Sequence, residues 1–216
     1  MARKTKAEAA LTRHRIVESA RQVFSRAGVT NTSLEEIAQE AGVTRGAVYW
    51  HFRDKADLFR AVRADTGTLL RLEPPGSADA LRRLETTLLE AIHRLRREPA
   101  ARQTYEVMLW KCEYVDELAP VRTELMKAGE AFAGELRELY AQAASEGLTE
   151  RGLDPRLAAL ETLCLYAGMV KLWLADMGGE LLRSQVEAMI RQHVASRRRR
   201  EPALTPPPAS PRKKAK

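Results

Sequence analysis

The chain has 216 residues, of which 44% are hydrophobic and 30% are charged, a balance typical of a soluble helical protein with one large or two small domains. Its two cysteines, Cys112 and Cys164, stand far apart and its four histidines are scattered, so neither a disulfide scaffold nor a metal site is expected. We therefore expect a cytoplasmic protein without a cofactor. The longest apolar run, residues 163–170, is too short to cross a membrane.

The net charge of +7 is unevenly distributed along the sequence. Residues 1–60 carry 11 basic and 7 acidic side chains, residues 61–196 carry 17 and 21, and residues 197–216 carry 8 and 1. A basic first segment beside an acidic middle segment indicates that the first contacts a polyanion such as nucleic acid and the second does not.

The first segment begins with basic residues 1–11, which are expected to be mobile, either as a frayed terminus or as an arm that reaches DNA phosphates. A first helix is predicted over residues 12–27, because Ile16, Ala20 and Phe24 recur at helical spacing and Gly28 follows. This helix closes a small three-helix core.

Two short helices separated by a tight turn are predicted next. Ser33 occupies an N-cap position, and Glu36 three residues later completes a capping box. Gly42 ends this helix, and Thr44 caps the following one, predicted over residues 45–52. Two short helices joined by a glycine-containing turn form the helix-turn-helix of DNA-binding proteins.

The second short helix would read DNA. Arg45 is the strongest hydrogen-bond donor at its start, with Thr44 and Ala47 beside it, whereas Trp50 and Phe52 are expected in the core. The predicted contacts to DNA phosphates come from Thr32, Ser33, Tyr49, His51 and Lys55.

The rest of the chain shows helical periodicity. Helices are expected over residues 55–72, 79–97, 100–115, 120–147, 155–177 and 180–197. No stretch alternates with period two for long enough to predict a strand, so the predicted fold class is all-α. The last two helices have more apolar surface than one buried face needs, which predicts either a four-helix interface between two copies or a larger monomer core.

The run VTRGAVYWHFRDKADLF, residues 43–59, resembles the signature of the TetR family of one-component transcriptional repressors. The resemblance extends without a gap from Thr12 to Phe59. The opening MARKTK and the run YEVMLWKCEYVDEL, residues 105–118, resemble the AcrR-type branch, which represses multidrug efflux pumps. The resemblance implies a ligand-responsive repressor that binds a palindromic operator as a homodimer. A small hydrophobic effector, drug-like or aromatic, would release it.

The resemblance also implies an effector cavity in the C-terminal half. The candidate wall residues are apolar, aromatic or sulfur-containing, which suits planar apolar compounds: Met108, Trp110, Cys112, Phe132, Leu136, Met169 and Trp173. Plain core packing is the alternative for each of them. Glu113 and Asp65 are candidate polar anchors, and Cys112 is also a candidate redox switch. The acidic pocket residue implied by the AcrR-type comparison falls on Gly67, which argues against a preference for cationic drugs.

The predicted organisation has three parts. These are a DNA-binding helix-turn-helix domain over residues 1–54, a ligand-binding and dimerisation domain over 55–197, and a disordered, proline-rich basic tail over 198–216. The tail is either simply solvated or attracts DNA without sequence preference. A rival hypothesis is an all-α small-molecule carrier without specific DNA binding. Enzymatic activity is not expected, because the sequence has no metal constellation, nucleophile elbow or phosphate loop.

Overall fold

The computed structural model describes residues 6–72, 76, 78–176 and 178–199. Over these residues the fold is all-α, as predicted, and the backbone bridge outside the helices joins Thr149 to Arg198. The α-helices are α1 (Lys6–Ala27), α2 (Leu34–Glu40), α3 (Arg45–His51), α4 (Lys55–Thr66), α5 (Ala80–Arg97), α6 (Pro99–Trp110), α7 (Ala119–Ser145), α8 (Pro155–Ala175) and α9 (Val186–Arg197), and a short 3-10 helix is η1 (Asp116–Leu118).

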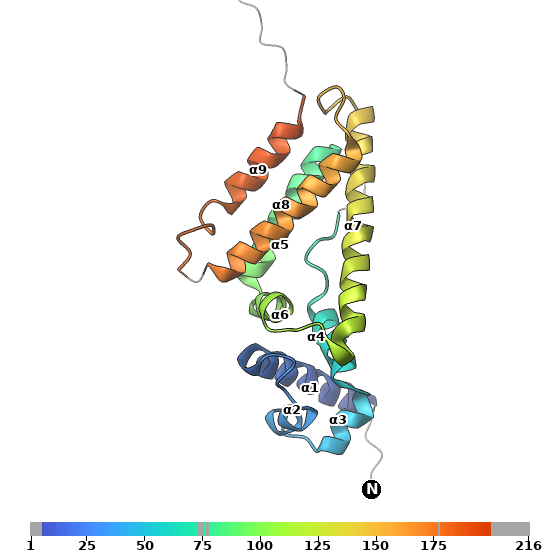
Figure 1. The fold of residues 1–216 in the computed structure, drawn as a ribbon, viewed down its shortest axis with the longest axis vertical. Coiled ribbons are helices and arrows are strands. Elements are labelled where there is room, and N and C mark those ends of the chain that lie inside the picture. The colour runs from blue at the N-terminus through green and yellow to red at the C-terminus, as the bar shows by residue number, and fades with distance from the viewer. Residues whose placement is uncertain (1–5, 73–75, 77, 177, 200–216) are drawn as a thin grey trace, which may run out of the picture.

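The molecule is elongated, with a small unit of α1–α3 at one end and a bundle of α5, α7, α8 and α9 at the other (Figure 1). α4 and α6 lie at the junction between them, and α7 runs from the junction to the far end of the bundle. α1 packs against α4 and α6 as well as against α2. The small unit is therefore attached to the bundle through a shared set of helices.

Hydrogen bonds at the helix starts define the small unit. The Ser33 hydroxyl accepts from the Glu36 N–H at 3.2 Å, and the Glu36 carboxylate accepts from the Ser33 N–H at 2.7 Å, which confirms the predicted capping box. These bonds from Ser33 hold the pKa of Glu36 below its ordinary value. Thr44 caps α3 as predicted, since its hydroxyl accepts from the Ala47 N–H at 3.2 Å.

The core of the small unit continues into the rest of the chain. Its buried centre is formed by Ile16, Phe24, Ile37, Val48 and Phe52. The same cluster includes Phe59 of α4, Val107 of α6 and Val121 of α7. The predicted boundary after residue 54 thus lies within one cluster of buried residues, and this packing couples α3 to α4 and α6.

α1 begins earlier than predicted. Residues 6–11 are helical, so the expectation that they form a mobile terminus is wrong. Three alanines, which favour helix, and Glu8 in the first turn, which suits the positive end of the helix dipole, explain the extension. Arg3 and Lys4, the start of the expected DNA-contacting arm, lie outside the described residues.

Two glycines with positive φ make a matched test of the small unit. Gly42, in the turn between α2 and α3, has φ +62°, and no atom lies within 4 Å of a Cβ placed on it. Gly28, after α1, has φ +81°, and its Cβ would lie 3.3 Å from the Lys111 carbonyl oxygen. Gly42→Ala should therefore lower the free energy of unfolding by about 1 kcal/mol and Gly28→Ala by about 2 kcal/mol, measured by urea denaturation. Equal losses would show that the Lys111 carbonyl yields without cost.

Three helix ends differ from prediction. α4 ends at Thr66 rather than at residue 72, because Gly67 adopts φ +66° and turns the chain. α6 ends at Trp110 instead of near residue 115. α9 begins at Val186 instead of residue 180, because the Asp176 carboxylate accepts hydrogen bonds from the N–H groups of residues 181–183 at 2.8–3.3 Å and holds them in a turn. Apolar periodicity alone does not register such a competing carboxylate.

The larger core lies within the bundle. The predicted inward stripe of α5 is fully buried and consists of Leu81, Leu84, Leu88, Ile92 and Leu95. α8 is long and apolar enough to cross a membrane by length and composition alone, but 44% of its most apolar window is buried inside the molecule. Its inward face, with Tyr166, Met169 and Trp173, packs in the larger core, as expected for the central helix of a bundle.

Arg198 and Arg199, assigned by sequence to the tail, are attached to the bundle. The Arg198 guanidinium lies 2.9 and 3.0 Å from the Asp79 carboxylate oxygens, and the Arg199 N–H donates to the Leu148 carbonyl at 2.7 Å. The remainder of the predicted basic tail, residues 200–216, lies outside the described residues.

Candidate nucleic-acid interface and effector cavity

α3 presents one face to solvent. Arg45, Tyr49 and Trp50 are exposed on it, whereas Val48 is fully buried. Trp50 is 72% exposed, so the prediction that it belongs to the core is wrong. Val48 and Phe52 pack inward one turn apart, and the residue midway between them lies on the opposite side of the helix. The Trp50 ring packs edge-on against His51, with centroids 4.4 Å apart.

Arg45 occupies the first position of α3, where its contacts are easily exchanged. Its guanidinium carbon lies 5.4 Å from the Tyr49 ring centroid, and one guanidinium nitrogen lies 3.5 Å from the Tyr49 hydroxyl. The Glu35 carboxylate lies 3.8 Å away. Such contacts between exposed side chains contribute little in water. The guanidinium can therefore replace them with the paired acceptors of a guanine edge.

The neighbours of Arg45 lie where the sequence predicts. Thr44 is exposed beside it, and Ala47 is half-buried on the following turn. Four of the predicted phosphate-contact residues come together around one open hollow of about 410 Å³: Thr32, Ser33, Tyr49 and Lys55. His51 lies apart from that hollow, half-buried.

Two residues around this hollow are engaged internally. The Thr32 side chain is buried, and its hydroxyl donates to the Gly28 carbonyl at 2.7 Å. Lys55 is 14% exposed, and its ammonium donates to the carbonyls of Thr30 and Thr32 at 2.9 and 3.1 Å and lies 3.5 Å from the Glu117 carboxylate. This arrangement does not support the phosphate contacts predicted for these two residues, because their polar atoms hold the turn between α1 and α2.

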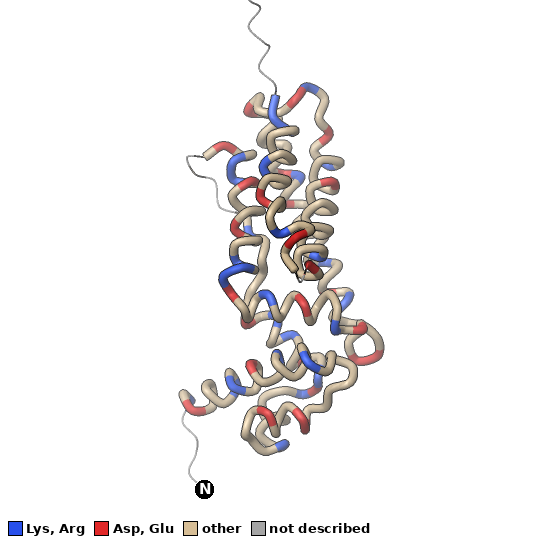
Figure 2. Tube along the Cα trace, turned by 90° about the vertical axis from the view of Figure 1, so that its left-hand side faces the viewer, with Lys and Arg blue, Asp and Glu red and all other residues tan. Residues whose placement is uncertain are grey.

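Fewer basic side chains of the small unit are available to DNA than the charge count of residues 1–60 implies. Basic and acidic positions are interspersed over both parts of the molecule (Figure 2). Arg3 and Lys4 lie outside the described residues, and Arg21 and Lys55 are paired internally. Attraction to DNA in this part of the chain therefore depends on individual exposed cations such as Arg45 and Arg53 rather than on a continuous basic block.

The seven predicted cavity residues are scattered. Phe132, Leu136, Met169 and Trp173 are buried in the larger core, and their assignment to an effector cavity stays a prediction. Trp110 is exposed, with the Lys171 ammonium 4.9 Å from its ring centroid. Cys112 lies half-buried at the edge of the smaller core. Met108 lines a cavity between α4, α6 and α7.

Two cavities lie on either side of the segment that links α4 to α5. The junction cavity, of about 420 Å³, lies between α4, α6 and α7, and its wall includes Arg60, Arg63, Tyr105, Met108, Glu124 and Leu125. The α5 cavity, of about 350 Å³, is lined by Arg71, Thr87, Glu90 and Arg94. Gly67 and Thr68 line both cavities, so the linking segment is the partition between them.

The α5 cavity contains an unsatisfied polar group. Thr87 is 4% exposed, and its hydroxyl has no hydrogen-bond partner in the described part of the chain. The Tyr166 hydroxyl and the Trp173 indole N–H, both in α8, are likewise unpartnered there. Because buried polar atoms are nearly always paired in native proteins, these atoms are ready to be satisfied by a ligand or by water.

Known proteins match both halves of the chain. The family model described as "Bacterial regulatory proteins, tetR family" matches residues 16–62. The model described as "MAATS-type transcriptional repressor, C-terminal region" matches residues 79–196, more than half of the chain. The chain belongs to the TetR family.

TetR-family relatives match over most of the chain. The transcriptional regulator TtgR of Pseudomonas putida is 33% identical over 179 residues, covering 81% of this chain and 85% of TtgR. AcrR of Shigella flexneri is 43% identical over 127 residues, covering 56% of this chain and 59% of AcrR. The crystal structure of NalD, the secondary repressor of the MexAB-OprM multidrug efflux pump in Pseudomonas aeruginosa, has a TM-score of 0.77 at 32% identity, covering 90% of this chain and 99% of NalD.

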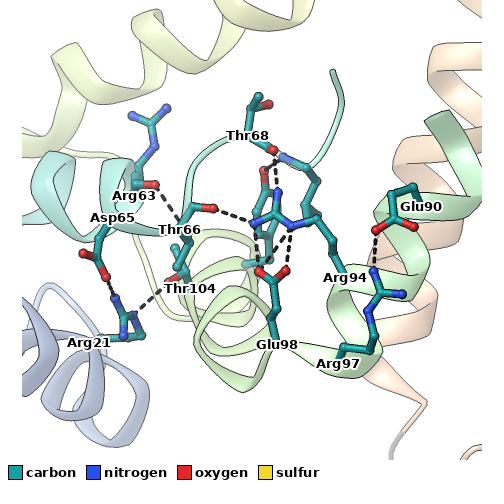
Figure 3. A network of polar contacts seen from close by, with 12 residues as sticks. Arg21, Arg63, Asp65, Thr66, Thr68, Glu90, Arg94, Arg97, Glu98 and Thr104 are labelled. Atoms are coloured by element: carbon teal, nitrogen blue, oxygen red, sulfur yellow. Dashed lines mark hydrogen bonds and ion pairs between the residues drawn. The ribbon is translucent and has the colours of Figure 1, made fainter. Parts of the chain in front are cut away.

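In this TetR-family chain a polar network joins α1 to the helices around the junction cavity (Figure 3). Arg21 of α1 is 1% exposed, and its guanidinium contacts the carboxylates of Glu18 and Asp65 and donates to the Thr104 hydroxyl at 3.1 Å. Asp65 belongs to α4, and Thr104 precedes the cavity residue Tyr105 in α6. Asp65 is therefore the ion-pair partner of Arg21, which corrects its prediction as an effector anchor.

A second part of the network fastens the partition between the cavities. Arg94 of α5 donates to the Thr66 and Thr68 carbonyls at 2.7 and 2.8 Å and pairs with Glu98 at 2.9 Å. From the other side, the Tyr105 hydroxyl accepts from the Leu69 N–H at 3.1 Å. The segment after α4 is thus held by both α5 and α6 (Figure 3).

Cys112 lacks the electrostatic surroundings of a reactive thiol in this TetR-family chain. Burial raises the pKa of the Cys112 thiol to about 11, although the Tyr114 hydroxyl and the nearby cations act in the opposite direction. Because the thiolate is the reactive form, this pKa disfavours the redox switch considered from sequence. The neighbouring Glu113, the other predicted polar anchor, is exposed.

Proposed function

We propose that this chain is a ligand-responsive transcriptional repressor of the cytoplasm. It binds a palindromic operator as a homodimer and releases it when a small hydrophobic effector occupies the C-terminal domain. The proposal rests on α3, which is capped and exposed on one face. The buried side of α3 packs in a core that it shares with α4 and α6, and these two helices form walls of the junction cavity. Because these helices share one packed core, an effector that moves the cavity walls also changes the spacing of the two recognition helices.

The relatives support an efflux pump as the regulated target. NalD is described as the secondary repressor of a multidrug efflux pump, and a protein of Escherichia coli, 31% identical over 196 residues, as the probable acrEF/envCD operon repressor. We propose by extension that this chain represses a multidrug efflux operon.

The proposed operator contacts start from α3. Arg45 reads base edges, with Thr44 and Ala47 against the neighbouring bases. Ser33, Tyr49 and His51 contact the phosphates that flank them. Thr32 and Lys55 are left out of this set because their polar atoms bond within the protein; Lys55 would have to give up Glu117 to reach a phosphate.

The proposed homodimer uses α8. Apolar and small residues recur on this helix every three or four positions and are exposed: Leu157, Leu160, Cys164, Gly168 and Leu172. A stripe of this kind along a whole helix is typical of a helix that packs against a second copy. A two-fold dimer also places two copies of α3 at the spacing of successive major grooves, about 34–36 Å or a multiple of it.

Leu160→Glu should disrupt this dimer. A carboxylate in the middle of the α8 stripe would be buried without a partner, so we expect the dimer dissociation constant to rise at least about 100-fold, measured by analytical ultracentrifugation. Met126→Glu is the matched control, because Met126 is an exposed apolar residue on a different helix, α7. A dimer that tolerates Leu160→Glu as well as Met126→Glu would place the subunit interface elsewhere.

The alternative of a small-molecule carrier predicts no preferred DNA sequence. Selection of binding sites from a random DNA library by the full chain separates the two functions. The repressor should enrich a sequence with two inverted half-sites, because a two-fold dimer imposes its symmetry on the operator. Enrichment of no sequence above background would favour the carrier.

A further inference from the structure

We infer that the effector of the junction cavity is an organic anion: a carboxylate, or a comparable acidic group, on a compact apolar or aromatic body. The inference rests on the proposed function and adds to it the charge of the ligand. Its basis is an arginine guanidinium in the cavity wall that forms no hydrogen bond in the described part of the chain, together with an excess of positive over negative charge in that wall.

The guanidinium without a hydrogen bond belongs to Arg63 of α4. Its side chain is 21% exposed, yet in the described part of the chain its guanidinium has one partner, the Glu124 carboxylate, at 3.8 Å. That distance is an ion pair but too long for a hydrogen bond. In Figure 3 the guanidinium points away from the Arg21–Asp65 contact. A planar group with five N–H donors thus lines the cavity with its hydrogen-bonding capacity nearly unused.

Glu124 cannot satisfy Arg63, because Arg60 already holds it. Nε of Arg60 lies 2.9 and 3.2 Å from the two Glu124 oxygens, and a terminal Arg60 nitrogen lies 2.9 Å from the first of them. One carboxylate is therefore shared by two guanidiniums. Gly67, which also lines the cavity, supplies no charge. The wall retains one net positive charge, which favours an anion and disfavours an ammonium group.

The remainder of the wall suits an apolar body. Met108, Leu125 and the Tyr105 ring face the same cavity as Arg63. Its volume of about 420 Å³ lies within the usual range for small-molecule sites. A ligand that places its acidic group on Arg63 and its ring between α6 and α7 would form the paired, bidentate contact that Arg63 lacks.

A matched set of ligands tests the inference. 2-Naphthylacetate, 2-naphthylacetamide and 2-naphthylethylamine share one aromatic body and carry a negative, no and a positive charge. Binding of each to the full-length chain is measured by calorimetry, without DNA. We expect the acetate to bind at least about 10-fold more tightly than the amide, because only the acetate completes a charge-assisted pair with Arg63. The amine should bind most weakly, because its ammonium group would face a wall with one net positive charge.

Two variants assign the preference to Arg63. Arg63→Gln keeps the polarity of the side chain and removes its charge, so it should weaken acetate binding about 10-fold and leave amide binding unchanged. Arg102→Gln is the control, since Arg102 lies on α6 outside the cavity and its contact is with Glu106 at 4.0 Å. It removes the same charge and should leave both affinities unchanged.

The outcomes separate this inference from the proposed function. Equal binding of the three compounds, tightest binding of the amine, or equal loss of acetate and amide binding in Arg63→Gln would overturn the anion preference. Absence of binding by all three up to about 1 mM would overturn it as well. Failure of the chain to bind DNA, together with Arg63-dependent binding of the acetate, would instead refute the repressor and retain the anion site.

Discussion

Replacement of Arg21 by methionine should lower the free energy of unfolding by about 3 kcal/mol. Arg21 is 1% exposed, and its guanidinium meets Glu18, Asp65 and Thr104 from three helices. Removal of one partner of a buried ion pair costs about 3–5 kcal/mol, because the remaining groups stay desolvated and unpaired. We expect a loss at the lower end of this range, because the Asp65 side chain is 31% exposed and water can hydrogen-bond to it once the guanidinium is removed. Thermal or urea denaturation of the purified chain measures the loss.

Two comparisons make this result interpretable. Arg26→Met removes a guanidinium from the same helix, but Arg26 pairs with Glu40 at the surface, so this variant should unfold nearly as the wild type does. In the double variant Arg21→Met with Asp65→Leu, the Asp65 carboxylate is no longer left without its partner, and the Glu18 carboxylate, which is 43% exposed, can be hydrated, so part of the stability should return. If Arg21→Met is no less stable than Arg26→Met, the Arg21 network does not hold α1 against α4 and α6.

Arg45→Ala should weaken operator binding about 10- to 100-fold while affinity for random DNA changes little. The reason is the position of Arg45 at the start of α3, exposed and held by weak contacts to Tyr49 and Glu35. An arginine that forms two hydrogen bonds with one guanine carries sequence information that a phosphate contact does not. Fluorescence anisotropy with operator and scrambled duplexes at the same salt concentration gives both affinities.

Arg45→Lys is the matched control for charge. Lysine keeps the positive charge but lacks the planar fork, so the operator preference should fall while the salt dependence of binding stays as in the wild type. Base readout by Arg45 would be refuted if Arg45→Ala weakened binding to the operator and to random DNA by the same factor. Arg45 would then contact only the phosphate backbone.

Local signals predict the small unit well. Ser33 and Thr44 cap their helices, and Gly42 adopts the positive φ of the turn, because each feature depends on a few neighbouring residues. The error at Trp50 has a different origin. Its residue type suggests burial, whereas its spacing from Val48 and Phe52 indicates the opposite face of α3. Spacing is the better guide than residue type at this position.

The junction between the two parts cannot be predicted in the same way. Arg21, Arg63 and Arg94 lie on amphipathic helices, where isolated arginines normally belong to the solvated face. Their roles depend on Asp65, Glu124 and the carbonyls after α4, which reach them through the packing of different helices. Sequence spacing within one helix carries no information about such partners.

The effector residues show the same limitation. Aromatic and sulfur-containing side chains suggest a cavity, and Phe132, Leu136, Met169 and Trp173 lie in the core of the bundle, where residue type does not distinguish a cavity wall from plain packing. The junction cavity is lined more by charged residues of α4 and α7 than by that set, with Met108 common to both.

The most direct test of the repressor is operator binding by the full chain with and without an effector, followed by fluorescence anisotropy. The duplex is the sequence enriched from the random library, and the titration contains excess non-specific DNA and a series of small aromatic and drug-like compounds. Tight binding that resists the competitor and is reversed by at least one compound, with the compound bound to the protein, is the predicted result. Operator affinity that no bound compound alters would contradict ligand control, and failure to distinguish the selected sequence from random DNA would contradict the repressor itself.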